Sequence, residues 1–209
     1  MEIQFYGANC ISLNFKPLRI VVDDNLAELG KKSILKDDDV ALFTSDIGNI
    51  TRKNSKLTID CPGEFEVGDV SVIGIPARAH TDEPQQHSAV MYKITAGDVT
   101  TLITGHVYPE FSEAQLEAIG LPDVVVIPVG GHGYTLDPQG AMTIIKEIEP
   151  KIVIPTNYSI KGISYPIPQL QLDEVLKELS MDTPETLPKL KLKSSDLGDT
   201  TKLIVLDAS

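Results

Sequence analysis

The sequence predicts a mixed α/β fold in which helices lie outside a sheet core. The first half consists of short apolar or alternating runs separated by turn residues, which is typical of strands. The second half alternates continuous apolar runs with segments whose apolar residues recur at helical spacing. Because the chain has 209 residues and shows no linker or low-complexity segment, we expect a single domain over residues 1–209.

Short strands are predicted along the first half of the chain, most of them in antiparallel-looking succession. Glycine, proline, asparagine and aspartate stand between them, as at Pro17, Pro62-Gly63 and Gly68-Asp69, and these residues favour turns. The predicted strands cover residues 3–5, 10–15, 18–22, 40–44, 57–60, 64–67, 70–75, 88–94 and 100–104.

Helices are predicted only after about residue 105. Ser112 and Gln115 have the spacing of a capping box, in which each side chain satisfies a backbone N–H of the other residue. Asp137 before Pro138 is a favourable N-cap for a second helix. Apolar residues at 141, 144, 145 and 148, and again at 172, 175, 176 and 179, form helix faces. Strands are expected at 124–129, 152–154 and 202–206, and residues 180–201 are expected to form a loop.

The charge balance excludes some classes of partner. Lysine plus arginine number 18 and aspartate plus glutamate number 30, so the formal net charge is −12. Such a protein is not expected to bind nucleic acid or an anionic membrane surface, since both attract positive charge. It also repels anionic substrates unless a metal or a positive cluster reverses the field at the site.

Targeting signals are missing from the sequence, and its cysteines do not form a framework. Cys10 and Cys61 are the only cysteines and are not arranged as a CxxC pair. No apolar run approaches the length of a membrane span, and residues 1–5 do not resemble a signal peptide. Together these observations predict a reducing, cytoplasmic location.

Common catalytic motifs do not occur. The glycine-rich segment 128–137 lacks the Lys-Ser/Thr pair of a phosphate loop, and Leu136 stands where a dinucleotide loop needs glycine. The histidines His80, His87, His106 and His132 form no HxH, HxxxH or HExxH pattern. A nucleophile elbow of the form GxSxG is also missing.

Several segments nevertheless resemble one family, in the same order along the chain. Residues 1–7 resemble an opening strand that leads to Gly-His-Ser-Cys, and 62–68 resemble a Pro-Gly-Glu-Tyr-Glu-Val element. Further matches are 21–23, 111–120, 128–136 and 152–158. The chain is thereby similar to the metallo-β-lactamase superfamily, in particular to L-ascorbate-6-phosphate lactonase-like, zinc-dependent hydrolases. The resemblance implies a four-layer α/β/β/α sandwich.

The departures from that family fall on its metal ligands. The family motif His-x-His-x-Asp-His aligns with 45–50, where this chain has no histidine. A later ligand histidine is matched by His80, while His106 stands at the bridging aspartate position and Asn157 replaces the last histidine. The ancestral site positions are therefore Ser45, Asp46, Ile47, Asn49, Ile50, His80, His106 and Asn157.

This ligand count governs the expected chemistry. A catalytic zinc keeps three protein ligands and one open position, and it lowers the pKa of its bound water to near 7. His80 and His106 alone are too few, and Ile47 and Ile50 would place apolar bulk where metal and water belong. We therefore expect no metal and no other cofactor. If a metal is held after all, His80 and His106 are the candidate ligands and zinc or manganese the candidate ions.

Three functions remain open. The first is a catalytically inactive or strongly diverged member that acts as a binding or scaffold module, with a small polar ligand, a protein partner or a second copy of the chain. The second is a metal-dependent hydrolase with a rearranged site, drawing on Asp46, His80, His106, His132 or Asp23. The third is a metal-free pocket for a small polar molecule, lined by Ser45, Asn49, His80, His106 and Asn157.

Overall fold

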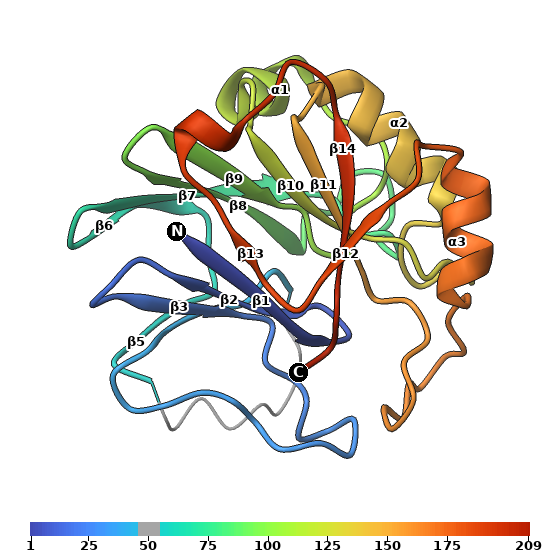
Figure 1. Cartoon of the computed structure of the whole chain (residues 1–209), viewed down its shortest axis with the longest axis horizontal. Helices are drawn as coiled ribbons and strands as arrows, with labels where there is room; N and C mark the ends of the chain where they lie inside the picture. Colours follow the sequence, from blue (N-terminus) through green and yellow to red (C-terminus); the bar gives the residue numbers. More distant parts are fainter. Residues whose placement is uncertain (46–54) are drawn as a thin grey trace.

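Two β-sheets packed face to face form the centre of the molecule, as the computed structural model in Figure 1 shows. The structure describes residues 1–45 and 55–209. Strand order is β13-β1-β2-β3-β4-β5 in the first sheet and β12-β14-β11-β10-β9-β8-β7-β6 in the second. A continuous cluster of buried apolar side chains joins the facing surfaces of the two sheets. The predicted sandwich is thus confirmed.

The first sheet mixes antiparallel and parallel pairs. β1, β2 and β3 pair antiparallel, whereas β3, β4 and β5 pair in parallel. The antiparallel expectation is therefore wrong for this part of the chain, because the long connection over 23–39 returns β4 alongside β3 in the same direction. Its strands are β1 (Glu2–Gly7), β2 (Cys10–Asn14), β3 (Arg19–Val22), β4 (Val40–Leu42), β5 (Leu57–Ile59) and β13 (Leu190–Lys191).

The second sheet divides into an antiparallel meander and a parallel half. β6 to β9 follow one another antiparallel, and β9, β10, β11, β14 and β12 then pair in parallel. Every residue of β10 and β11 is buried, as their continuous apolar runs predict. The strands are β6 (Gly63–Val67), β7 (Val70–Ala77), β8 (Ala89–Ala96), β9 (Val99–Ile103), β10 (Val124–Pro128), β11 (Ile152–Thr156), β12 (Glu185–Leu187) and β14 (Lys202–Leu206).

Helices α1 (Glu113–Ile119), α2 (Pro138–Ile148) and α3 (Leu172–Leu179) lie on the side of the second sheet (Figure 1). The capping box of α1 is confirmed: Ser112 accepts the N–H of Gln115, and the Gln115 side chain accepts the N–H of Ser112. Asp137 caps α2 by accepting the N–H of Gly140 at 2.7 Å. The apolar face predicted for α2 is buried, so burial and capping favour the same register.

A turn-rich segment, not a helix, covers the outer face of the first sheet at 23–39. Because side chains alternate along a strand, Ile20 faces the core between the sheets and Val21 faces outward. Val21 and Cys10 form a small buried cluster with Leu26 from this segment. The segment thereby closes the outer face and reaches the edge of the sheet where β3 ends.

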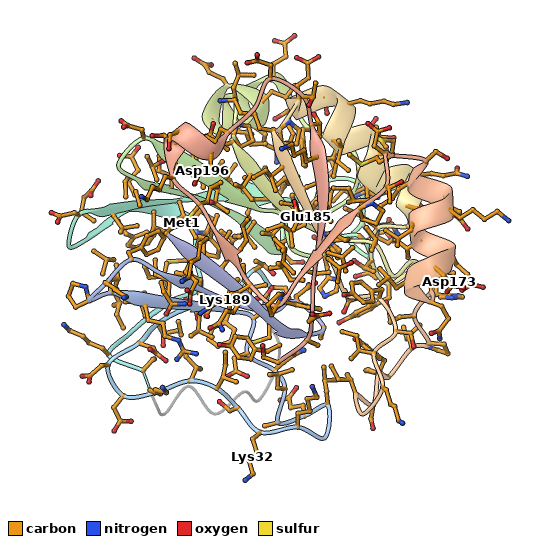
Figure 2. All side chains as sticks on the ribbon, in the orientation of Figure 1. Met1, Lys32, Asp173, Glu185, Lys189 and Asp196 are labelled. Atoms are coloured by element: carbon orange, nitrogen blue, oxygen red, sulfur yellow. The ribbon has the colours of Figure 1, made fainter. Side chains whose placement is uncertain are left out.

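The C-terminal part of the chain crosses repeatedly between the two sheets. β12 and β14 belong to the second sheet, whereas β13 pairs with β1 in the first. Lys189, labelled in Figure 2, forms an ion pair with Glu2 at 3.0 Å. The loop predicted for 180–201 is therefore wrong, since it contains β12, β13 and the short 3-10 helix η1 (Ser194–Asp196). Strands of two or three residues are too short to show a periodic pattern.

None of the helices within the described ranges is long and apolar enough to cross a membrane.

Candidate functional site: a polar pocket between the two sheets

A cavity of about 310 Å³ opens at one end of the sandwich. Asp23 follows β3 and Ser45 follows β4, while His106, Tyr134 and Asn157 come after β9, β10 and β11. These strands run in parallel within their sheets, so their carboxyl ends meet at one edge. The edge of a sheet at the carboxyl ends of its strands is a common ligand site in α/β folds. We take this cavity, called the polar pocket below, as the candidate functional site.

Asp23 lies on the first-sheet side of the pocket and is almost fully buried. Its Oδ1 accepts the N–H of Thr44 at 2.8 Å and its Oδ2 accepts the Thr44 hydroxyl at 2.6 Å. Burial raises the pKa of Asp23 to about 6, while the two bonds from Thr44 act in the opposite direction. Since each carboxylate oxygen has a donor from the end of β4, Asp23 ties the ends of β3 and β4 together.

Asn9 links the two sheets across the floor of the pocket. It sits in the tight turn between β1 and β2, where Ala8 has a positive φ of 48°. Its Oδ1 accepts the hydroxyl of Thr156 at 2.9 Å, and its Nδ2 lies 3.0 Å from Nε2 of His106. Because the amide nitrogen only donates, Nε2 of His106 accepts this bond and the ring proton is on Nδ1.

His106 is held as a neutral base. Its Nδ1 is buried and has no hydrogen-bond partner among the described residues. The ring packs against Tyr134, with centroids 4.8 Å apart. Burial, together with the nearby His80, lowers the pKa of His106 to about 4. At neutral pH the imidazole therefore carries no charge.

Gly105 brings the second-sheet side close to the first. It has a φ of 64°, which favours glycine, and a Cβ at this position would collide with the side chain of Thr44. The turn that carries His106 thus packs directly on the residue that bonds Asp23. The two sides of the pocket are positioned by this contact.

Asn157 lines the second-sheet side of the pocket, directly after β11. Its side chain is buried and donates to Oε1 of Gln169 at 3.0 Å, and its backbone N–H donates to the carbonyl of Ala8 at 2.8 Å. A Cβ on Gly130 would collide with Gln169, so the glycine-rich segment after β10 allows this close packing. Asn157 is thereby fixed by bonds to the protein itself.

Two loops form the mouth of the pocket. Asn25 and Glu28 come from the segment after β3, while Ser164 and Tyr165 come from the segment after β11. The loops are joined by the N–H of Ser164, which donates to the carbonyl of Leu29 at 2.9 Å. Glu28 is exposed, and Oδ1 of Asn25 is buried without a partner in the described part of the chain.

His80 lies next to His106 but is not among the residues that line the polar pocket. Its N–H donates to the carbonyl of His106 at 2.7 Å, and its Nδ1 is buried without a partner in the described ranges. The turn that carries it is braced by Asp82, which accepts the N–H of Ala79 at 2.9 Å. His80 thus supports the backbone of His106 and contributes to its electrostatic environment.

The structure brings together some of the residues singled out in the sequence. Ser45, His106, Asn157 and Asp23 all line the polar pocket, whereas His132 is exposed and does not line it. The remaining predicted site positions, Asp46, Ile47, Asn49 and Ile50, lie outside the described residues.

Within residues 1–45 and 55–209, no group of three or more His, Cys, Asp or Glu side chains is arranged to hold a metal ion. The Nε2 lone pair of His106, which a metal would use, already accepts a hydrogen bond from Asn9. A zinc ion takes lone pairs from several such atoms at once. The described residues therefore do not fit the metal site that the family resemblance implies.

Two pocket residues, Asn9 and Glu28, and the neighbouring Thr44 that bonds Asp23 were not predicted from the sequence. Asn9, Thr44 and Glu28 carry no motif, and their roles depend on which strand ends lie side by side. A signal exists only for Asn9: it sits in the short break between two apolar runs, directly after the Gly7-Ala8 pair that replaces Gly-His. Thr44 is a buried strand-end threonine like several others in the chain.

Comparison with known proteins places the chain among hydrolase-like folds. A family model described as a β-lactamase superfamily domain matches residues 2–157. Two curated relatives are named UPF0173 metal-dependent hydrolase. The one from Thermoplasma acidophilum is 47% identical over 47 residues, which is 21% of this chain and 20% of that protein. The one from Archaeoglobus fulgidus is 28% identical over 104 residues, which is 46% of this chain and 45% of that protein. Each match thus spans less than half of the relative's own length.

A solved structure gives the same fold over nearly the whole chain. It is a Thermotoga maritima protein described as a Zn-dependent hydrolase of the metallo-β-lactamase superfamily. The two are 23% identical with a TM-score of 0.75, and the match covers 98% of this chain and 97% of the other. At this identity the likeness establishes the fold. Family model and fold agree, and the chain belongs to the metallo-β-lactamase superfamily.

Proposed function

We propose that this chain is a diverged member of its superfamily that has lost most of the ancestral metal ligands and binds a small polar molecule in the polar pocket without a metal. The observation that carries the proposal is the way the polar side chains are satisfied. Asn9 donates to the lone pair of His106 that a metal would use, and Thr44 donates to both oxygens of Asp23. At His106 the bond continues through Asn9 to Thr156, so a closed hydrogen-bond network stands in place of an open metal ligand.

The tautomer of His106 strengthens this argument. Because Nε2 accepts from Asn9, Nδ1 carries the proton and offers no lone pair to a cation. Metal binding would require the Asn9 amide to turn away, which would also break its bond to Thr156. The residues at 45, 47, 49 and 50 support the same conclusion from the sequence, since none is histidine or aspartate.

The pocket remains suited to a ligand after the metal site is discounted. A volume of about 310 Å³ lies at the lower end of the range for small-molecule sites. Its wall combines Tyr134 and Tyr165 with amide, hydroxyl and carboxyl groups, a mixture that holds a small polar molecule by shape and hydrogen bonds. Both cysteines are free, which supports a reducing compartment such as the cytoplasm.

Elemental analysis of the purified chain tests the proposal. The protein is dialysed against metal-free buffer at neutral pH, and its zinc, manganese and iron contents are measured. We expect far less than one atom of any of these metals per chain, and no change of melting temperature on adding a chelator. A stoichiometric metal that survives dialysis, and whose removal lowers the melting temperature, would overturn the proposal.

A metal-dependent hydrolase of the L-ascorbate-6-phosphate lactonase-like type, with a rearranged site, is the second candidate. It is favoured by the buried Nδ1 atoms of His80 and His106, which have no partners in the described ranges, and by the names of the curated relatives. Asp46 would have to add a ligand from outside the described residues. Hydrolysis of a lactone or phosphodiester panel with zinc or manganese, abolished by His106→Ala, would support it. No turnover with any divalent ion would reject it.

A further inference from the structure

Resting on the proposed function, we infer that the ligand of the polar pocket is a small organic cation, such as a protonated amine or a quaternary ammonium compound. The inference depends on which hydrogen-bonding groups of the pocket are already used within the protein. It also depends on the charges that remain on its wall.

Three of the pocket's donors are already used within the protein. The amide nitrogen of Asn9 donates to His106, and that of Asn157 donates to Gln169. The Tyr165 hydroxyl donates to the carbonyl of Tyr158 at 2.7 Å. An anionic ligand needs several free donors, and these three groups could contribute only by giving up their present partners.

Two acceptor groups of the pocket are available to a ligand. Oδ1 of Asn25 is buried without a partner in the described part of the chain, and Glu28 forms no ion pair with any described residue. An unsatisfied buried acceptor is costly, and a ligand N–H group removes that cost. The proton on Nδ1 of His106 is the exception among the buried side-chain nitrogens of the pocket, and one neutral ligand oxygen would satisfy it.

The charges on the wall have one sign. Asp23 and Glu28 are the acidic lining residues, and no lysine or arginine from the described ranges lines the pocket. Lys31, which belongs to the same segment as Asn25 and Glu28, donates to the carbonyl of Tyr6 at 3.4 Å. The charged side chains among the described lining residues are thus carboxyl groups alone, so the pocket has a negative electrostatic field. A cation is attracted into such a site and an anion is repelled.

Aromatic side chains complete the wall. Tyr134 and Tyr165 both line the pocket, and tyrosine rings attract alkylammonium groups through the negative charge of their faces. The ring of Tyr165 is held by its hydroxyl bond to Tyr158. The pocket thus offers apolar surface for the carbon atoms of the ligand and carboxylates for its charge.

Isothermal titration calorimetry with a charge-matched panel tests this inference. The probes are choline, putrescine and agmatine as cations, glycerol and urea as neutral molecules, and ascorbate and inorganic phosphate as anions. We expect at least one cation to bind above neutral pH, with an affinity that falls as salt is raised, and the neutral and anionic probes to bind at least tenfold more weakly.

Matched variants assign the binding to the pocket. Glu28→Gln removes one carboxylate from an exposed position of the mouth and should weaken the cation by about fivefold without affecting the fold. Glu66→Gln makes the same change on exposed strand β6, outside the pocket, and should leave the affinity unchanged. Asp23→Asn, whose side chain still accepts the N–H of Thr44, should weaken binding further.

The outcomes separate this inference from the proposed function. An anion or neutral probe that binds in the metal-free protein, and is lost in a Tyr134→Ala variant, would overturn the cation inference and keep the metal-free binding function. Cation binding that Glu28→Gln and Asp23→Asn leave unchanged would overturn the assignment to this pocket. If no probe binds, both the inference and the metal-free binding function are rejected.

Discussion

The two sides of the polar pocket each carry one buried ionisable group, and the pKa values of these two groups are shifted in opposite directions. On the first-sheet side, Asp23 is bonded twice to Thr44 within its own sheet, and burial raises its pKa to about 6. On the second-sheet side, His106 accepts its bond from Asn9 of the other sheet, and burial lowers its pKa to about 4. Desolvation therefore favours the neutral form on both sides. Between about pH 4 and 6 neither Asp23 nor His106 is charged. Above about pH 6 Asp23 ionises and makes this part of the pocket negative.

The largest expected effect comes from forcing the two sides of the pocket apart. Gly105→Ala places a methyl group against Thr44 and onto a backbone with positive φ, and we expect it to lower the free energy of unfolding by about 3 kcal/mol. Gly97→Ala is the control, because Gly97 also has a positive φ but no atom within 4 Å of its Cβ position. Urea unfolding of both variants measures the difference. Equal losses in the two variants would show that the sheets do not depend on the contact between Gly105 and Thr44.

Removing Asp23 or His106 singly should change how the stability of the protein depends on pH. The raised pKa of Asp23 contributes stability that is fully present below its unfolded value of 3.8 and is lost as the pH rises through about 6. The lowered pKa of His106 contributes stability that is present above 6.5 and is lost as the pH falls through about 4. In the parent protein the two slopes oppose one another between about pH 4 and 6.

In the parent protein the two opposing contributions largely cancel in the plot of unfolding free energy against pH. Each single variant should therefore show the slope of the group that remains. Between about pH 4 and 6, stability should rise with pH in Asp23→Asn and fall with pH in His106→Gln, each by on the order of 2 kcal/mol. Asp38→Asn changes an exposed carboxyl and should keep the profile of the parent. Urea unfolding at several pH values measures all four proteins. Parallel profiles of stability against pH in the two pocket variants would contradict the opposite pKa shifts of Asp23 and His106.

A smaller effect is expected from weakening the hydrogen bonds between Asp23 and Thr44 on the first-sheet side. Thr44→Val removes the hydroxyl that donates to Asp23 and keeps the N–H that also does so. We expect a loss of about 1.5 kcal/mol above neutral pH, because a bond to an ionised carboxylate is worth more than one to a neutral acid. The loss should shrink below about pH 5, where Asp23 is protonated. Thr101→Val is the control, since the hydrogen bond found for the buried hydroxyl of Thr101 within the described residues is a long one, to the sulfur of Met1 at 3.7 Å. An equally large loss in the control would assign the effect to the exchange of any buried hydroxyl for a methyl group, and not to the bond with Asp23.

Local patterns in the sequence were enough to predict most elements of this fold. The apolar run that became β10, and the capping residues Ser112 and Asp137, act through near neighbours and carry their own signal. The parallel pairing of β3 with β4 carries none, because it depends on how 23–39 folds back. The short strands β12 and β13 were missed because they are stabilised by distant partners.

The pocket was predictable only where the family resemblance pointed to it. Ser45, His106 and Asn157 were singled out as ancestral positions and lie in one cavity. Asn9 and Thr44 were not, although they satisfy His106 and Asp23. Hydrogen-bond partners are set by the approach of separate strand ends, as Gly105 allows for Thr44. That approach is a property of packing across sheets, which one sequence does not reveal.

The crossing of the C-terminal segment between the sheets has a consequence for how the protein is made. β1 obtains its outer neighbour β13 only when residues near 190 are available, and the N–H of Ser209 bonds the carbonyl of Phe5 at 3.0 Å. Pairings at such long sequence separation form slowly, because most of the chain must be ordered before they are gained. During synthesis the first sheet therefore emerges with an open hydrogen-bonding edge, which is a template for pairing with other chains. β13 closes that edge once residues near 190 have been translated.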